Sequence, residues 1–336
     1  MVSNISNIAC KYCQSEYVIK YGTYKDTQYY WCKDCKRKFS NPDAIPKMQT
    51  STRTVADVLN MYYEGLSEAE IRRNLIQQDN SYISTGSVYN WVNRFSKMAI
   101  LEANKYKPDV GSVWVADETV IDIDGKNIWF WDILDTKTRF LIASHMSYTR
   151  TSKDAQALMK QAYDRTGKIP RVIYTDKLRA YLDGIELTFG GDTTHKQGSP
   201  FDVEVNTNLI ERFHGTIKSR TKVMRGLHTV ESARLFMDGW LVHYNFFRPH
   251  MSLRDRTPAQ VAGITFPFRN WKDVTEQPYE VTARIPEYVP KPVYRLVMPR
   301  RKAVRITKRK RPRISRRMPR ITPPMLSLSQ IRMKKR

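Results

Sequence analysis

The stretch Val113–Ile123, VWVADETVIDI, indicates the fold most strongly, because its β-branched and aromatic residues are typical of a strand. It is followed by Asp124-Gly125, a dipeptide that favours a tight hairpin turn. Residues 127–134 and 139–146 have a similar composition and predict two further strands. The chain from 113 to 146 is therefore expected to form a three-stranded meander.

Outward from the meander, residues 151–166 (TSKDAQALMKQAYDRT) begin with an N-cap signal and predict a helix that ends at Gly167. Residues 171–175 (RVIYT) predict a short apolar strand that stops at Asp176. The order β-β-β-α-β, followed by more helix, is the ribonuclease H-like arrangement. We therefore predict an α/β fold with a mixed five-stranded sheet covered by helices.

Three carboxylates are placed to converge on this frame. Asp117 lies within the first predicted strand and Asp176 at the end of the fourth, and these strands are parallel neighbours in a ribonuclease H-like sheet. Glu211 lies in residues 206–220 (NTNLIERFHGTIKSR), a predicted helix, beside its apolar stripe. That stripe consists of Leu209, Ile210, Phe213 and Ile217.

Convergent carboxylates suit metal-assisted phosphodiester chemistry. Two Mg²⁺ ions ~3.5–4 Å apart activate an attacking water or 3′-hydroxyl and stabilise the leaving oxygen. Mg²⁺ prefers hard oxygen ligands and keeps several waters, so a few carboxylates suffice. A single Asp at a strand end is more often a cap or turn residue. Glu118, Asp122 and Asp124 are alternatives to Asp117, although Asp124 is better explained by the turn.

The motifs around these residues resemble a known family. The DET at 117–119, the YTD that ends at Asp176, and Glu211 after 34 intervening residues are similar to the DDE motif of bacterial and archaeal insertion-sequence transposases, in the retroviral-integrase superfamily. Lys218 matches the basic residue that this family carries seven positions after its Glu. The YN at 244–245, RPH at 248–250 and TPAQ at 257–260 resemble the ending of related enzymes.

The resemblance covers about residues 50–265 and implies a catalytic core at 108–265. It implies two-metal 3′-end cleavage and strand transfer, with Asp117, Asp176 and Glu211 binding Mg²⁺ or Mn²⁺ and Lys218 near the DNA. Arg248 and His250 are interpreted as structural or as contacts to the DNA backbone. The partners implied are the transposon's terminal repeats and target DNA, and joining two ends predicts a homo-oligomer on DNA.

The four cysteines predict a structural zinc site. Cys10-x2-Cys13 and Cys32-x2-Cys35 are separated by 18 residues, within the range of zinc ribbons. Residues 18–31 can form a hairpin between them. Two disulfides or a redox pair are the alternatives, of which disulfides are disfavoured in a cytosolic chain. We therefore predict a zinc ribbon over residues 1–45.

Residues 50–104 predict three helices that bind DNA. Ser67 and Glu70 form a capping-box pattern, and residues 84–97 (STGSVYNWVNRFSK) resemble a helix-turn-helix recognition helix. The residues expected to face a major groove are Ser87, Asn90 and Arg94, and those expected to pack inward are Val88, Trp91, Val92 and Phe95. A plain three-helix bundle is the alternative.

The charge is strongly asymmetric. The net charge is +24, and after Glu287 there are 18 Lys or Arg residues and no acidic residue. Residues 266–336 are therefore predicted to be a basic, largely disordered tail that clamps DNA non-specifically or is only a solvated segment. The DNA-binding residues predicted there are Arg300, Arg301, Lys308, Arg309, Lys310 and Arg311.

Three functions fit these observations: an active transposase, a catalytically idle DNA-binding regulator derived from one, and a structure-selective nuclease. The unbroken Asp, Asp, Glu set favours the first over the second. The predicted zinc ribbon and helix-turn-helix, which would read DNA sequence, disfavour the structure-selective nuclease, since junction nucleases recognise DNA shape. No apolar run approaches the ~20 residues that cross a bilayer, and no secretory signal is evident, so a cytoplasmic, nucleoid-associated prokaryotic protein is expected.

Overall fold

The computed structural model describes residues 8–198, 208–223 and 229–277. Its largest sheet has the strand order β6-β5-β4-β7-β8. The strands are β4 (Val113–Ile123), β5 (Lys126–Asp135), β6 (Leu141–Ser147), β7 (Val172–Thr175) and β8 (Thr194–Gln197). The first three are antiparallel, whereas β7 runs parallel to β4 and β8 parallel to β7. This is the ribonuclease H-like sheet that the sequence predicts.

The hairpin between β4 and β5 fixes the register of the sheet centre. Asp124 (φ 53°) and Gly125 (φ 72°) both have left-handed backbones, as a two-residue hairpin turn requires. The turn places Asp117 directly opposite Asp132. The position of β8 was not predicted, because its residues THKQ are polar and largely exposed.

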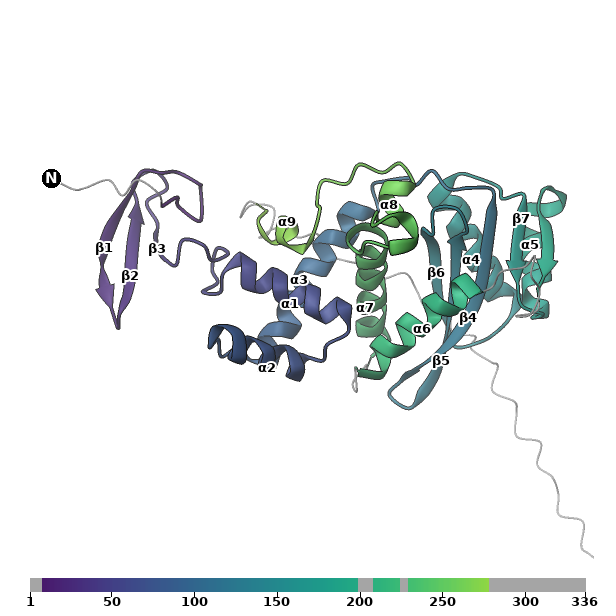
Figure 1. Ribbon diagram of the computed structural model, residues 1–336, viewed down its shortest axis with the longest axis horizontal. Helices are drawn as coiled ribbons and strands as arrows, with labels where there is room; N and C mark the ends of the chain where they lie inside the picture. The colour runs from purple at the N-terminus through teal and green to yellow at the C-terminus, as the bar shows by residue number, and fades with distance from the viewer. Residues whose placement is uncertain (1–7, 199–207, 224–228, 278–336) are drawn as a thin grey trace, which may run out of the picture. The chain divides into compact units, whose positions relative to one another are not determined.

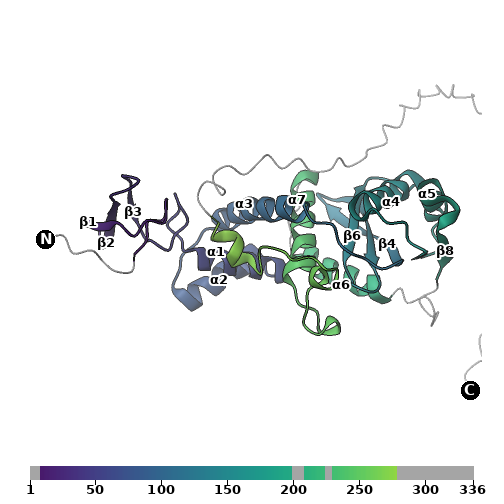
Figure 2. The same cartoon turned by 90° about the horizontal axis from the view of Figure 1, so that it is seen from above.

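Helices cover both faces of the sheet (Figures 1 and 2). On one face lie α4 (Ser152–Thr166) and α5 (Arg179–Phe189), which ends in the short helix η1 (Gly190–Asp192). These two helices approach closely at Gly184, where an added Cβ would come within 2.7 Å of the Ala155 Cβ. The other face is crossed by α6 (Asn208–Val223), which packs on β4.

The N-terminal helices are α1 (Thr52–Glu64), α2 (Glu68–Asp79) and α3 (Thr85–Ala103). The capping box of Ser67 and Glu70 is present, as predicted. Helix α3 runs six residues beyond its predicted end, because its apolar residues continue and pack against α7 (Val230–Val242). These helices and the sheet share one hydrophobic core.

The segment after α7 explains two of the sequence motifs. A π-helical turn, η2 (His243–Phe247), is followed by η3 (Met251–Leu253), α8 (Pro258–Val261) and α9 (Trp271–Thr275). The Asn245 amide donates to Leu141 O at 3.0 Å and accepts from Leu141 N at 2.9 Å, so it pairs with the backbone of edge strand β6. Thr257 and Gln260 form the capping box of α8. Both motifs therefore have structural roles.

A second, three-stranded sheet contains β1 (Val18–Tyr24), β2 (Thr27–Cys32) and β3 (Lys38–Ser40). The hairpin was predicted and the third strand was not. This sheet has its own small core of Cys10, Val18, Cys32 and Phe39. Along the part of the chain that the structure describes, no helix has the length and apolar character needed to pass through a membrane.

Candidate metal and nucleic-acid site

An acidic group lies where β4 and β7 run side by side. Val115 is paired with Tyr174 in the parallel register, so Asp117 and Asp176 lie level with each other two residues later. Oxygens of Asp117, Glu118 and Asp176 all lie within 4.8 Å of one another. The two aspartates that the sequence singles out are therefore brought together, and such a set of hard oxygen donors fits a divalent cation.

Asp117 is held by a buried histidine. His214 Nδ1 lies 3.3 Å from Asp117 Oδ2, and its Nε2 lies 3.2 Å from Asp132 Oδ2. Burial raises the pKa of Asp132 to about 6, although the hydrogen bond with His214 opposes this shift. Burial disfavours the charged imidazole, but the bonds to Asp117 and Asp132 outweigh it and raise the pKa of His214 to about 9.

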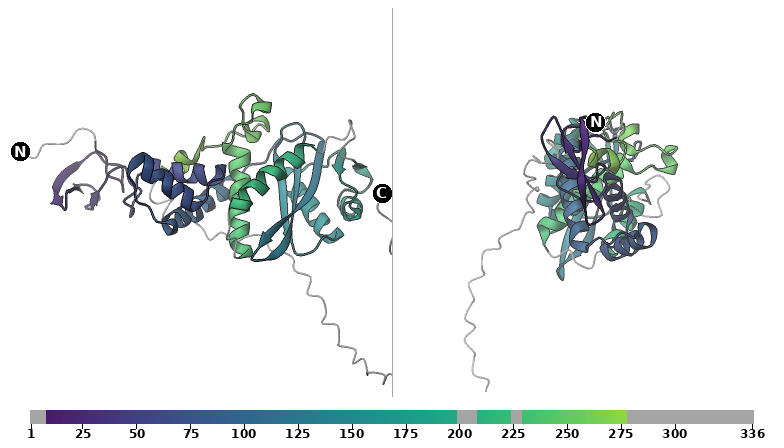
Figure 3. Two further views of the ribbon diagram at one scale, coloured as in Figure 1. Left: turned by 60° about the horizontal axis from the view of Figure 1, so that its bottom comes forward. Right: turned by 90° about the vertical axis from the view of Figure 1, so that its left-hand side faces the viewer.

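Helix α6, which contains the third predicted carboxylate, crosses the sheet and packs on β4 (Figure 3). Glu211 lies three residues before His214 and Lys218 four residues after it, so all three share one helical face. Both Glu211 and Lys218 are exposed. Glu211 is outside the group of touching carboxylates, and it forms no hydrogen bond or ion pair with any described residue.

Glu118 has a different environment from Asp117. Its Oε1 accepts bonds from Nε (2.7 Å) and Nη2 of Arg150, and its Oε2 accepts one from the Tyr181 hydroxyl at 2.7 Å. Burial raises the pKa of Glu118, and the bonds from Tyr181 and Arg150 oppose that shift. Arg150 Nη2 also lies 3.5 Å from Asp176 Oδ2, while Asp176 Oδ1 accepts the Leu178 N–H at 2.8 Å.

The cysteines form a second group of metal donors. The Sγ atoms of Cys10 and Cys35 are 3.5 Å apart, and those of Cys13 and Cys32 are 3.6 Å apart. A disulfide would need about 2.05 Å, whereas four thiolates around a tetrahedral zinc ion lie ~3.8 Å apart. Burial opposes ionisation of Cys32, but backbone N–H groups of Cys35 and Asp34 help to lower its pKa to about 7. The four residues fit zinc.

The predicted recognition helix packs as expected on its inner side. Val88, Trp91, Val92 and Phe95 are all buried. On the other side, Asn90 is exposed, while Ser87 and Arg94 are half-buried. The Ser87 hydroxyl lies 3.0 Å from that of Ser84 at the helix cap, and the Arg94 guanidinium lies over the Phe95 ring. Groove contacts by these residues stay a prediction.

The remaining predicted DNA contacts are only partly placed. Arg248 is half-buried beside η2, and His250 packs edge-on against Tyr244. Burial lowers the pKa of His250 to about 4, which suits a neutral structural histidine. The tail residues between Arg300 and Arg311 lie outside the described residues.

Sequence reasoning missed Asp132, His214, Arg150 and Tyr181. One signal was available for Asp132, because a two-residue turn at Asp124-Gly125 pairs position 117 with position 132. His214 shares a helical face with Glu211 and was therefore also detectable. Arg150 and Tyr181 follow only from the packing of α4 and α5 against the sheet.

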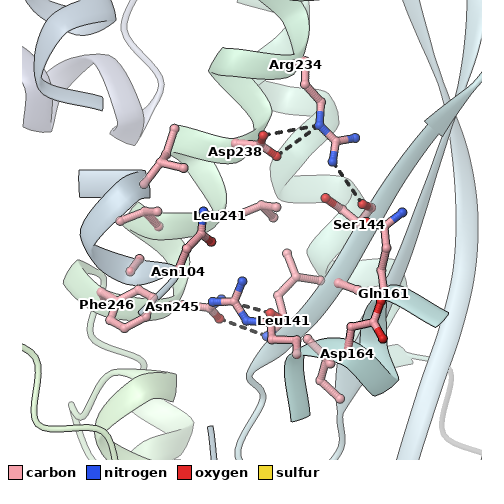
Figure 4. Close-up of a pocket in the computed structure, with 16 residues that line it drawn as sticks. Asn104, Leu141, Ser144, Gln161, Asp164, Arg234, Asp238, Leu241, Asn245 and Phe246 are labelled. Atoms are coloured by element: carbon pink, nitrogen blue, oxygen red, sulfur yellow. Dashed lines mark hydrogen bonds and ion pairs between the residues drawn. The ribbon is translucent and has the colours of Figure 1, made fainter. Parts of the chain in front are cut away.

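A cavity of about 340 Å³ lies elsewhere, between β6, α3, α4 and α7 (Figure 4). Its polar residues are largely engaged with one another: Arg234 pairs with Asp238 and donates to Ser144 O, and Asn245 bonds Leu141. None of the acidic group lines this cavity. We therefore assign it no part in the chemistry.

Comparisons with known proteins bear on the central segment. Residues 111–250 match a family model described as a DDE domain. No curated protein matches the chain. Among solved structures, the magnesium-bound HTLV-2 integrase catalytic core domain (trimeric form) is 18% identical, with 46% of this chain and 97% of that chain covered and a TM-score of 0.37.

Two other structures are similar at the same level. The catalytic core domain of BIV integrase is 17% identical, with 45% of this chain and 93% of that chain covered and a TM-score of 0.36. A simian T-cell lymphotropic virus intasome in complex with PP2A regulatory subunit B56 gamma is 15% identical, with 72% and 80% covered and a TM-score of 0.35. Residues 111–250, which include Asp117, Asp176 and Glu211, are therefore similar to a DDE domain.

Proposed function

We propose that the chain is a DNA transposase that binds the ends of its element, cleaves at their 3′ ends and transfers those strands into target DNA. The observation that carries this proposal is the position of Asp117 and Asp176 on adjacent parallel strands, beneath the helical face that bears Glu211 and Lys218. No comparable set of carboxylates occurs elsewhere among the described residues.

The proposed ligands are Asp117, Asp176 and Glu211. Two magnesium ions held there would activate the attacking hydroxyl and stabilise the leaving oxygen. The protein's own residues prepare the ligands: His214 restrains the Asp117 carboxylate, and the Leu178 N–H orients that of Asp176. Lys218, exposed and two turns from Glu211, is placed to bind a backbone phosphate.

The zinc ribbon and the three N-terminal helices are proposed to bind the element's ends. On the ribbon, the Lys38 ammonium lies 4.8 Å from the Tyr21 ring centroid and 4.4 Å from that of Tyr29, so cations and aromatic rings alternate on its surface. Such a surface suits the phosphates and bases of nucleic acid. We propose zinc as its structural ion and a homo-oligomer as the form that joins two ends.

The test is the isosteric change Asp176→Asn. The Mg²⁺-dependent joining of a 3′-OH end to a second duplex should disappear, while binding to the same DNA in a gel-shift assay persists. Joining that survives in Asp176→Asn would refute the assignment. A wild-type protein that binds the ends but never cuts or joins them would favour the idle regulator instead.

A further inference from the structure

Arg150 occupies an unusual place beside the acidic group. It lies between β6 and α4, in a segment fixed by Asp154, whose Oδ2 accepts the hydroxyls of Thr149 and Thr151, both at 2.7 Å. Its guanidinium lies over the Trp129 ring, 4.8 Å from the centroid. A long side chain is thus held in one orientation before any substrate arrives.

Only some of the N–H donors of the Arg150 guanidinium form hydrogen bonds with described residues. Nε and Nη2 bind Glu118, which is itself anchored by the Tyr181 hydroxyl. Nη1 forms no hydrogen bond or ion pair with a described residue, and the side chain is 36% exposed. An arginine that served only to neutralise Glu118 would not need an open edge next to Asp176.

Charge explains why an open cation is useful at this position. Glu118 and Asp176 lie beside Asp117, and together they repel a polyanion that must approach them. Arg150 offsets part of that repulsion: its Nη2 lies 3.5 Å from Asp176 Oδ2, and its Nη1 keeps two N–H groups that no described residue engages. Arginine is also the side chain best suited to phosphate oxygens, through its planar fork of donors.

We propose that Arg150 is a catalytic residue that donates hydrogen bonds to a non-bridging oxygen of the phosphate that is cut or joined. Glu118 acts as the anchor of the arginine in this arrangement, and Tyr181 as the anchor of Glu118. The inference rests on the proposed function, because it requires the reacting phosphate to lie beside Asp176.

A thermodynamic cycle that combines a change of Arg150 with a change of the DNA phosphate tests this contact through binding alone, without relying on catalytic turnover. The probe is a fluorescent duplex of the element's terminal sequence, with either a normal phosphate or an uncharged methylphosphonate at the mapped cleavage position. Binding is measured in Ca²⁺, with no Mg²⁺ or Mn²⁺ present, and a denaturing gel verifies that the DNA stays intact. The proteins are wild type, Arg150→Gln, Arg150→Lys and the matched control Lys153→Gln, which changes an exposed residue of α4.

In wild type and Lys153→Gln, the methylphosphonate should weaken binding by ~10- to 100-fold, as expected for lost charge-assisted hydrogen bonds. In Arg150→Gln the same replacement should weaken binding by less than ~3-fold, and Arg150→Lys should fall between the two. If Arg150→Gln folds poorly, Glu118→Gln is the second variant, because it keeps the shape of the anchor. It should also reduce the affinity difference between the phosphate and the methylphosphonate duplex relative to wild type.

An equal loss in wild type and Arg150→Gln would overturn the contact, because additive effects mean that the two groups do not meet. If wild type cuts the normal duplex in Mg²⁺ while the effects of Arg150→Gln and of the methylphosphonate on binding are additive, only the proposed role of Arg150 fails. If wild type neither cuts this DNA nor discriminates the methylphosphonate, the proposed function and the inference both fail.

Discussion

Replacing His214 with Gln should remove a pH-dependent part of the protein's stability. The imidazole side chain is 7% exposed and bridges two carboxylates, at 3.3 Å from Asp117 and 3.2 Å from Asp132. In the unfolded chain its pKa is about 6.5, whereas the two carboxylates raise it to about 9 in the folded protein. The folded state therefore binds a proton that the unfolded state releases near neutral pH.

The sign and size of the effect follow from this difference. A raised pKa contributes stability that is fully present below about pH 6.5 and is lost as the pH rises through about 9. Each pKa unit corresponds to about 1.4 kcal/mol, so the contribution is about 3 kcal/mol. The raised pKa of Asp132 contributes stability that is lost as the pH rises from about 3.8 through about 6, so its titration in wild type lies below this window.

The assay is urea unfolding of zinc-loaded protein between pH 6 and 10, without added Mg²⁺. The free energy of unfolding of His214→Gln is subtracted from that of wild type at each pH. The difference should fall by about 3 kcal/mol between pH 6.5 and 9, while the exposed control Lys222→Gln, on the same helix, should give a flat difference. A flat or rising curve for His214→Gln would show that the imidazole is not held as a cation between the two carboxylates.

Three further outcomes are expected. A mercurial reagent should release one zinc ion per chain, detected with a chromogenic chelator; Cys32→Ser should release none, and an equal yield from that variant would contradict the site. Removing residues 296–336 should flatten the plot of log K against log salt by ~4–5 units if the tail contacts five phosphates, and an unchanged slope would contradict the clamp. Glu211→Gln should weaken Mn²⁺ binding, followed by electron paramagnetic resonance, by at least ~10-fold. Glu118→Gln should weaken it far less, and the reverse order would exchange their roles.

The central sheet was predictable because each of its first four strands has a local signal. Val113–Ile123 is rich in β-branched residues, and its turn dipeptide determines the partner strand as well as the register. The return strand β7 is short but entirely apolar or β-branched apart from one tyrosine. In β8 the residues are polar, and only hydrogen bonds to β7 define the strand, so no pattern marks it.

The candidate site was predictable in Asp117 and Asp176 and not in the residues that support them. Asp117 follows from its place within a strand, and Asp176 from the end of another strand, which are local features. The partners of Glu118 come from residues 32 and 63 positions away, and the second carboxylate bound by His214 lies 82 positions away. Contacts over such separations depend on how helices pack on the sheet, which a single sequence does not specify.

The hydrogen-bond partners of Glu118 also bear on which carboxylate is proposed as the third metal ligand. Glu118 is closer to the aspartates, yet both of its oxygens already accept bonds from Arg150 and Tyr181. Binding a metal there would take the acceptor away from the part-exposed Arg150 guanidinium and from the buried Tyr181 hydroxyl. Loss of the buried hydroxyl's partner alone costs about 1–3 kcal/mol. Glu211 has no such contact among the described residues and shares a helical face with His214, which contacts Asp117, so it would break no bond on binding an ion. Glu118 is therefore better explained as an anchor of Arg150, and Glu211 stays the proposed ligand.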